Sequence, residues 1–115
     1  MLKADEIVTV VNHYTQQGED RYKCTVIRGA SWYWQNKVMV DNGLKHARVL
    51  KCRIPRENAP PGLSINPGDK IVREALESVT GADFAKLTRM YEGATVLDAH
   101  KNTYGPNPHW YVEGG

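Results

Sequence analysis

The pattern of apolar and polar positions along the chain predicts short β-strands separated by turns. Several stretches are dense in β-branched and aromatic residues, and many of these alternate with polar neighbours, as in strands with one buried face. On this basis about seven strands are expected, at residues 7–14, 22–34, 38–40, 44–54, 70–73, 94–100 and 109–112.

Turn-forming residues punctuate these stretches. Residues 16–20 and Asp41-Asn42-Gly43 supply the Gly, Asn and Asp that tight reversals between strands favour. Gly29 interrupts the second stretch, so a bulge or bend is expected there. The consecutive aromatic residues 32–34 must then point alternately to opposite faces of the continuing strand.

One stretch has the spacing of an amphipathic helix. Residues 82–91 hold apolar side chains at i, i+3 and i+7, namely Phe84, Leu87 and Tyr91. Thr80 or Ser78 can cap the N-terminus of this helix. A short helix with a single buried stripe is therefore predicted.

The segment Pro55–Gly68 differs in kind from the rest of the chain. It contains four prolines and two glycines, which disfavour regular structure. In compact domains, loops longer than about 12 residues tend to be functional or disordered. We therefore expect a long loop that projects towards a partner through Pro55, Pro60, Pro61, Leu63, Ile65 and Pro67.

Together these elements predict a mainly β protein. The expected fold is a small β-barrel or sandwich of about seven strands, with one short helix across an opening and the long proline-rich loop. A length of 115 residues with 41% apolar content suits one domain over residues 1–115. Because no run of 18 apolar residues and no signal-peptide pattern occurs, we expect neither a membrane span nor export.

Charge is distributed unevenly along the chain. Residues 21–56 hold nine basic side chains against Asp41 alone, a net charge of +8, whereas each flank sums to −3. This asymmetry suits an acidic partner, either nucleic acid or the acidic flank of an identical neighbour, and is also compatible with an ordinary solvated surface. The candidate interface residues are Arg48, Lys51, Arg53 and Arg56.

Aromatic residues beside the basic block suggest a second kind of site. Trp32, Tyr33 and Trp34 can stack nucleic-acid bases, as on the surface of a five-stranded oligonucleotide-binding barrel, while the basic residues neutralise phosphates. The alternative is that these residues and Trp110 pack in the core or at a subunit interface, where Trp and Tyr are enriched.

Motifs for catalysis or metal binding are not evident. The chain contains no G-x-S-x-G, P-loop, H-E-x-x-H or Gly-rich dinucleotide motif, so neither an enzyme nor a cofactor is expected. Asp98 and His100 share one strand face and form the nearest acid–base pair, but they lack a nucleophile. Cys24 and Cys52 lack the close spacing of zinc ligands and are expected to be reduced thiols.

Four stretches, read in order, carry a resemblance to a known family. They are TVIRGASWY (residues 25–33), PGDKIV (67–72), ATVLDAHKN (94–102) and PHWYVEG (108–114). The chain resembles, over nearly its whole length, small proteins encoded in the structural gene clusters of tailed bacteriophages.

This resemblance implies a virion role at the head-to-tail junction. Such proteins are similar to head-completion or stopper subunits, which form homo-oligomeric rings between the portal or adaptor ring and the tail terminator or tail tube, around packaged DNA. Assembly would take place in the bacterial cytoplasm. The resemblance also leaves open a tail terminator or another tail component, and the residues themselves leave open a nucleic-acid-binding module. Within a ring, the loop at residues 55–68 is expected to make inter-ring or channel contacts.

Overall fold

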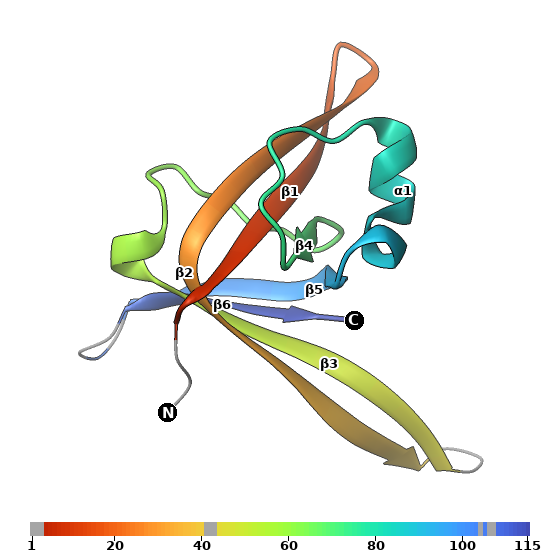
Figure 1. Cartoon of the computed structure of the whole chain (residues 1–115), viewed down its shortest axis with the longest axis vertical. Helices are drawn as coiled ribbons and strands as arrows, with labels where there is room; N and C mark the ends of the chain where they lie inside the picture. The colour runs from red at the N-terminus through yellow and green to blue at the C-terminus, as the bar shows by residue number, and fades with distance from the viewer. Residues whose placement is uncertain (1–3, 41–43, 104, 106–107) are drawn as a thin grey trace.

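The strands of the protein form one closed barrel. The structure is a computed structural model that describes residues 4–40, 44–103, 105 and 108–115, with the backbone alone at 37–40 and 44–47. Its elements in chain order are β1 (Glu6–Gln16), β2 (Glu19–Val40), β3 (Leu44–Pro55), the 3₁₀ helix η1 (Arg56–Asn58), β4 (Lys70–Val72), α1 (Gly81–Met90), β5 (Gly93–Asn102) and β6 (His109–Gly114). The predicted class, a small mainly β barrel with one short helix, is confirmed (Figure 1).

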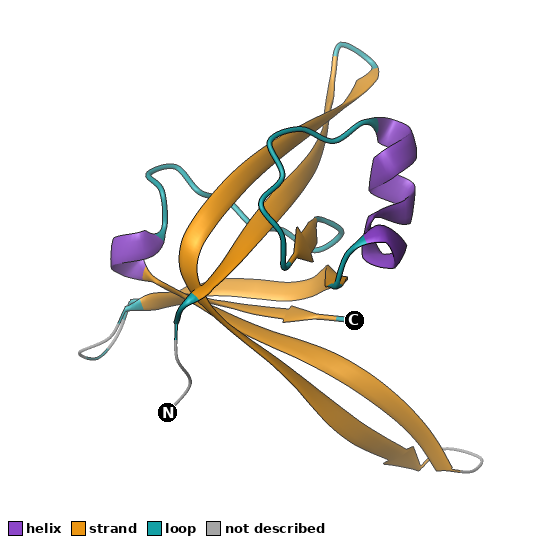
Figure 2. Ribbon diagram, viewed as in Figure 1, coloured by secondary structure: helices purple, strands orange, loops and turns teal. Residues whose placement is uncertain are grey.

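The order of strands around the barrel is β1-β2-β3-β6-β5-β4. Each neighbouring pair is antiparallel, and the three-residue β4 closes the ring by pairing with both β1 and β5. Figure 2 shows these strands enclosing the centre, with α1 lying outside the strands. Closure pairs β4 and β6 on both sides and leaves open edges where β2 extends beyond its neighbours.

The described strands number six rather than about seven because β2 is longer than expected. The separate strand predicted at residues 38–40 is the end of β2, which runs unbroken for 22 residues. The turn predicted at Asp41-Asn42-Gly43 lies outside the described residues. The other predicted turn is a two-residue hairpin loop, in which Gln17 and Gly18 both have positive φ.

The irregularity expected at Gly29 is present. Glu6 pairs with Ala30 and Ile7 pairs with Arg28, so the pairing of β1 and β2 passes over Gly29, which has a φ of +103°. Immediately after this bulge β2 ends its pairing with β1 and begins its pairing with β3 at Ser31. The glycine therefore marks the point where β2 leaves one neighbour for the other.

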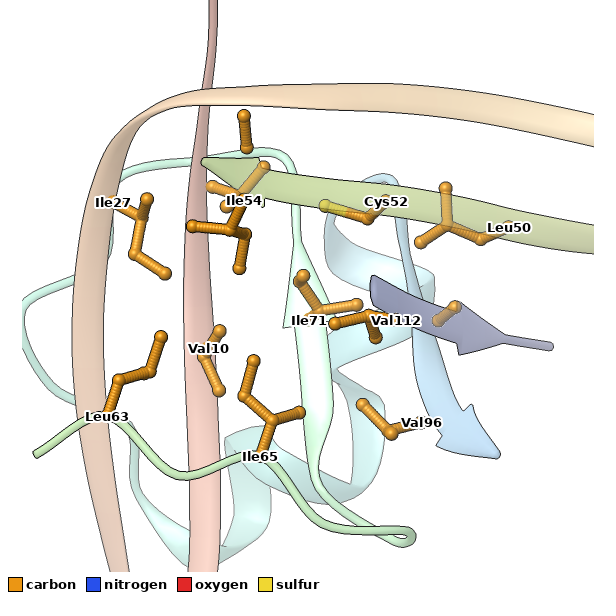
Figure 3. Close-up of a cluster of buried hydrophobic side chains, with 13 residues drawn as sticks. Val10, Ile27, Leu50, Cys52, Ile54, Leu63, Ile65, Ile71, Val96 and Val112 are labelled. Atoms are coloured by element: carbon orange, nitrogen blue, oxygen red, sulfur yellow. The ribbon is translucent and has the colours of Figure 1, made fainter. Parts of the chain in front are cut away.

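The interior of the barrel is filled by aliphatic side chains. Val10, Ile27, Leu50, Ile71 and Val112, from five strands, are all essentially buried and belong to one cluster (Figure 3). A smaller cluster, built on Val11, Val72 and Leu87, lies beneath α1. Thr80 caps this helix by accepting a hydrogen bond from the Asp83 amide, and Leu87 is its buried residue, as the predicted stripe required.

The segment at residues 55–68 corrects the expectation of a projecting loop. It begins with η1, and Leu63 and Ile65 are only 8% and 4% exposed because both side chains enter the barrel core (Figure 3). Burying these two aliphatic side chains removes them from water, which favours holding the segment against the barrel. Pro61 and Pro67 are exposed, and Pro55 and Pro60 are half-buried.

Asp69 anchors the end of this segment to β1. Its buried carboxylate accepts three hydrogen bonds. The donors are the backbone amide of Asn66 at 2.9 Å, the side-chain amide of Asn12 at 2.8 Å and the backbone amide of His13 at 3.1 Å. A buried carboxylate is tolerated when donors surround it in this way. The loop is thus a structural part of the monomer.

Candidate functional site

The four basic residues predicted to form an interface lie in three different places. Arg48 lies over the Trp34 indole, with its guanidinium carbon 4.5 Å from the ring centroid. Lys51 and Arg53 occupy alternate positions on the outward-facing side of β3, and Arg56 begins η1 at one end of the barrel. The structure therefore divides the basic set rather than gathering it into one patch.

The aromatic residues follow the alternation predicted for a strand. Trp32 and Trp34 are half-buried and pack against the barrel core, with their ring centroids 6.3 Å apart in an edge-to-face arrangement. Tyr33 points the other way and is 47% exposed. Trp110 also packs against the core. Three of these four residues thus contribute to packing, and Tyr33 is the most exposed of the four.

The outer face of the β2-β3-β6-β5 sheet carries mixed charge. Arg53 lies 6.0 Å from the centroid of the Tyr111 ring, and His100 lies against the other side of the same residue, with ring centroids 5.3 Å apart. Glu113 pairs with Lys51 across the strands. Burial, and then Glu113, raise the pKa of the Tyr111 phenol, while Arg53 opposes this shift.

Asp98 and His100, the candidate acid–base pair, share this exposed face. His100 Nδ1 and Asp98 Oδ2 are 3.8 Å apart, beyond hydrogen-bonding distance, and both side chains are more than half exposed. The structure places them together as predicted but surrounds them with solvent.

The most distinctive feature of the molecule is a two-stranded arm formed by the ends of β2 and β3. The two strands pair continuously from Ser31–Arg53 to Val40–Leu44. β1 pairs with β2 only as far as Ala30, and β6 pairs with β3 only from Leu50 onwards. Within the described parts of the chain, residues 35–40 and 44–49 therefore pair only with each other. Figure 1 shows this arm extending well beyond the barrel.

The root of the arm is fastened to the barrel through Trp34. Its indole Nε1 donates a hydrogen bond to Glu92 Oε1 at 3.1 Å. Glu92 in turn binds Arg73 at 3.0 Å, and Arg73 binds Glu6 at 3.1 Å. With Arg48 covering the ring, Trp34 is held by core packing, a hydrogen bond and a cation–π contact. These contacts fix the direction in which the arm leaves the barrel.

Sequence reasoning did not identify this arm. The available signal was the Asp41-Asn42-Gly43 turn between the strands expected at residues 38–40 and 44–54. Such a turn predicts a hairpin, but the length of the hairpin beyond the barrel depends on where β1 and β6 stop pairing.

Two further observations concern metal binding and membrane-spanning helices. In residues 4–40, 44–103, 105 and 108–115, no three His, Cys, Asp or Glu side chains are grouped so that they can hold a metal ion. In the same residues no helix is long and apolar enough to cross a membrane. Cys24 is half-buried and Cys52 is buried, and the two are free cysteines.

Comparison with known proteins places the chain in one family. Residues 3–115 match the model of a family of unknown function (DUF6751), and the chain belongs to that family. No curated protein and no solved structure matches it. The arm, the barrel and their contacts are therefore the basis for inferring a role.

Proposed function

We propose that the chain is a structural subunit of a tailed-bacteriophage virion, a head-completion or stopper protein that forms a ring with its own copies at the head-to-tail junction. The observation that carries this proposal is the β2–β3 arm. A two-stranded ribbon on its own is at best marginally stable in water, and open strand edges readily pair with a strand of another chain. The arm is therefore suited to contact a neighbouring subunit.

The position of the arm supports a ring in particular. A ring needs heterologous contacts, in which one patch of a subunit meets a different patch on the next. The arm leaves one end of the barrel, whereas the β1–β2 hairpin extends from another (Figure 1). An arm that leaves one side of the barrel can reach a different surface of the next subunit, as a heterologous contact requires.

The resemblance to small proteins of phage structural gene clusters supports the location. The portal or adaptor ring and the tail terminator or tail tube are the neighbours proposed for such a ring, with packaged DNA in its channel. The assembling element in this proposal is the arm. The segment at residues 55–68 is not chosen, because Leu63 and Ile65 hold it in the core.

Shortening the arm tests this proposal. In the arm variant, Asn-Gly replaces residues 37–47, which joins the paired residues Asn36 and Arg48 by a two-residue turn. In a matched control, Asn-Gly replaces residues 15–20 of the β1–β2 hairpin and joins the paired residues Tyr14 and Arg21. Sedimentation velocity and electron microscopy then compare the full chain and both variants, alone and with portal rings.

The full chain and the control variant are expected to form rings or to add to portal rings. The arm variant is expected to stay monomeric while keeping the circular dichroism spectrum of the barrel. Assembly of the arm variant as efficient as that of the full chain would refute the proposal. So would a full chain that stays monomeric and is missing from phage particles. Steeply salt-dependent DNA binding by such a monomer would favour the nucleic-acid-binding module instead.

A further inference from the structure

One end of the barrel contains a cavity of about 540 Å³. One wall is formed by η1 and the chain that follows it, and the other by the facing ends of β5 and β6. The Arg56 amide donates a hydrogen bond to the Pro108 carbonyl at 3.1 Å, which ties the two walls together. Barrel mouths are common ligand sites, and pockets of roughly 300–1,000 Å³ suit small organic ligands.

The floor of this cavity is apolar and firmly supported. Leu63 belongs to the barrel core, and Ala59 and Trp110 pack against it. Trp110 is also held within the sheet, between Ile54 of β3 and Lys101 of β5. The indole is thus a flat surface whose position is set by the core.

The rim of the cavity is basic. Arg56 and Lys101 are exposed side chains on opposite walls, and His109 lies beside Trp110. Lys101 Nζ lies over the Trp110 ring, 5.3 Å from its centroid, so the flexible Lys101 side chain brings a positive charge to the flat surface. Among the described residues that line the cavity there is no carboxylate. The site therefore favours an anion attached to a planar group.

We propose that this cavity binds a nucleoside phosphate unit, with its base against Trp110 and its phosphate between Arg56 and Lys101. Aromatic side chains stack bases of any sequence, and Arg and Lys bind phosphate through charge-assisted hydrogen bonds. Asn102 and Thr103 add polar side chains to the same wall. The unit comes either from a free nucleotide or from the end of a nucleic-acid strand. An acidic peptide meets the basic rim equally well but brings no flat ring for Trp110. This proposal does not depend on the β2–β3 arm.

Calorimetric titration of the full-length chain at low salt tests the proposal. The probes are thymidine monophosphate, hexathymidylate with and without a 5′-phosphate, inorganic phosphate and hexaglutamate. The variant Arg56→Gln/Lys101→Gln is expected to lose roughly tenfold or more in affinity for the thymidine probes. Trp110→Leu is expected to weaken binding of the thymidine probes and to leave inorganic phosphate binding unchanged.

The matched control is Lys23→Gln/Arg28→Gln, which removes two exposed basic residues of β2 that are outside the cavity wall. It is expected to bind the thymidine probes within about twofold of the unmodified chain. Tighter binding of the phosphorylated hexamer would identify a strand end as the source, and tighter binding of the monophosphate would identify a free nucleotide. The proposal is overturned if no thymidine probe binds, if Arg56→Gln/Lys101→Gln binds normally, or if phosphate or hexaglutamate binds as tightly as the nucleotides.

Discussion

At the scale of single residues, Gly29 is constrained both by its backbone conformation and by its contact with Asn58. Its φ of +103° is a conformation that side-chain-bearing residues rarely adopt. A Cβ added there would lie 2.5 Å from Asn58 Nδ2 and 3.1 Å from Asn58 Cγ. Asn58 cannot easily move away, because it donates a hydrogen bond to the Gly29 carbonyl at 2.9 Å. The residue that redirects β2 is therefore also packed against η1.

Gly29→Ala is expected to lower the free energy of unfolding by about 2–3 kcal/mol, through backbone strain and a steric clash together. Urea denaturation followed by circular dichroism measures this. Gly18→Ala is the matched control, since Gly18 also has a positive φ but has open space around it. It should cost about 1 kcal/mol, for the strain alone. Equal losses in the two variants would show that the contact with Asn58 is unimportant.

The two cysteines should differ in reactivity for a physical reason. Burial raises the pKa of the Cys52 thiol from 9.0 to about 12 and raises the pKa of Cys24 above 9.0. Because the thiolate is the reactive form, iodoacetamide at pH 8 should modify Cys24 slowly and should modify Cys52 only after unfolding. Mass spectrometry of digested protein measures both. Rapid modification of Cys52 in the folded protein would contradict its burial.

The same pKa shift makes stability depend on alkaline pH. Above about pH 9 the Cys52 thiol ionises in the unfolded chain but stays protonated in the folded one. Ionisation then stabilises the unfolded chain relative to the folded one. The contribution of Cys52 to the free energy of unfolding therefore falls as pH rises from about 9 towards 12. Cys52→Ala should flatten this part of the stability–pH curve, which urea denaturation at several pH values measures.

At the scale of elements, the arm depends on its root. Trp34 connects the paired strands to the barrel core and, through Glu92, to Arg73. Its neighbour Tyr33 faces solvent on the opposite side of β2. The stability of variants at these two adjacent aromatic residues can therefore be compared, because the residues lie side by side along β2 and differ mainly in their contacts.

Trp34→Ala is expected to destabilise the protein by about 2–4 kcal/mol, because a half-buried indole leaves a cavity beside the core. Trp34→Phe keeps most of the packing and should cost about 1 kcal/mol for the lost hydrogen bond to Glu92. Tyr33→Ala should change stability by less than about 1 kcal/mol. Thermal and urea denaturation measure all three. A Tyr33→Ala loss equal to that of Trp34→Ala would contradict the assigned orientation.

At the scale of the whole molecule, the barrel and the arm should differ in local stability. β4, β6 and residues 50–53 of β3 have a paired strand on both sides, whereas the outer edges of residues 35–40 and 44–49 have no partner among the described strands. Unpaired edge amides exchange with solvent faster than amides inside a closed sheet.

Hydrogen–deuterium exchange should therefore show slow exchange in β4, in β6 and at residues 50–53 of β3. Exchange at the edges of the arm should be fast in the monomer and slower after assembly. The β1–β2 hairpin turn is the internal reference for exposed amides. If the arm is protected equally in the monomer and in the assembled protein, then subunits do not associate through it.

Much of this fold could be predicted because it depends on local chemistry. Alternation placed the strands, and the helix at residues 81–90 follows from the Leu87 stripe and the Thr80 cap. The bulge at Gly29 follows from the backbone freedom of glycine. The strand face of Tyr33 follows from the two-residue period. Each of these depends on residues within a few positions of one another.

Local patterns in the chain are enough to define the class of protein: a small β domain with one helix, its turns and its uneven charge. Which residues meet across the barrel depends on the three-dimensional fold, because strand pairing joins residues far apart in the chain. Leu63 and Ile65, which were expected to project from the barrel, lie in its core. Arg48, Lys51 and Arg56, which were expected to form one interface, lie in different places. The fold also makes the ends of β2 and β3 an arm, since the reach of a hairpin is set by where its neighbouring strands end.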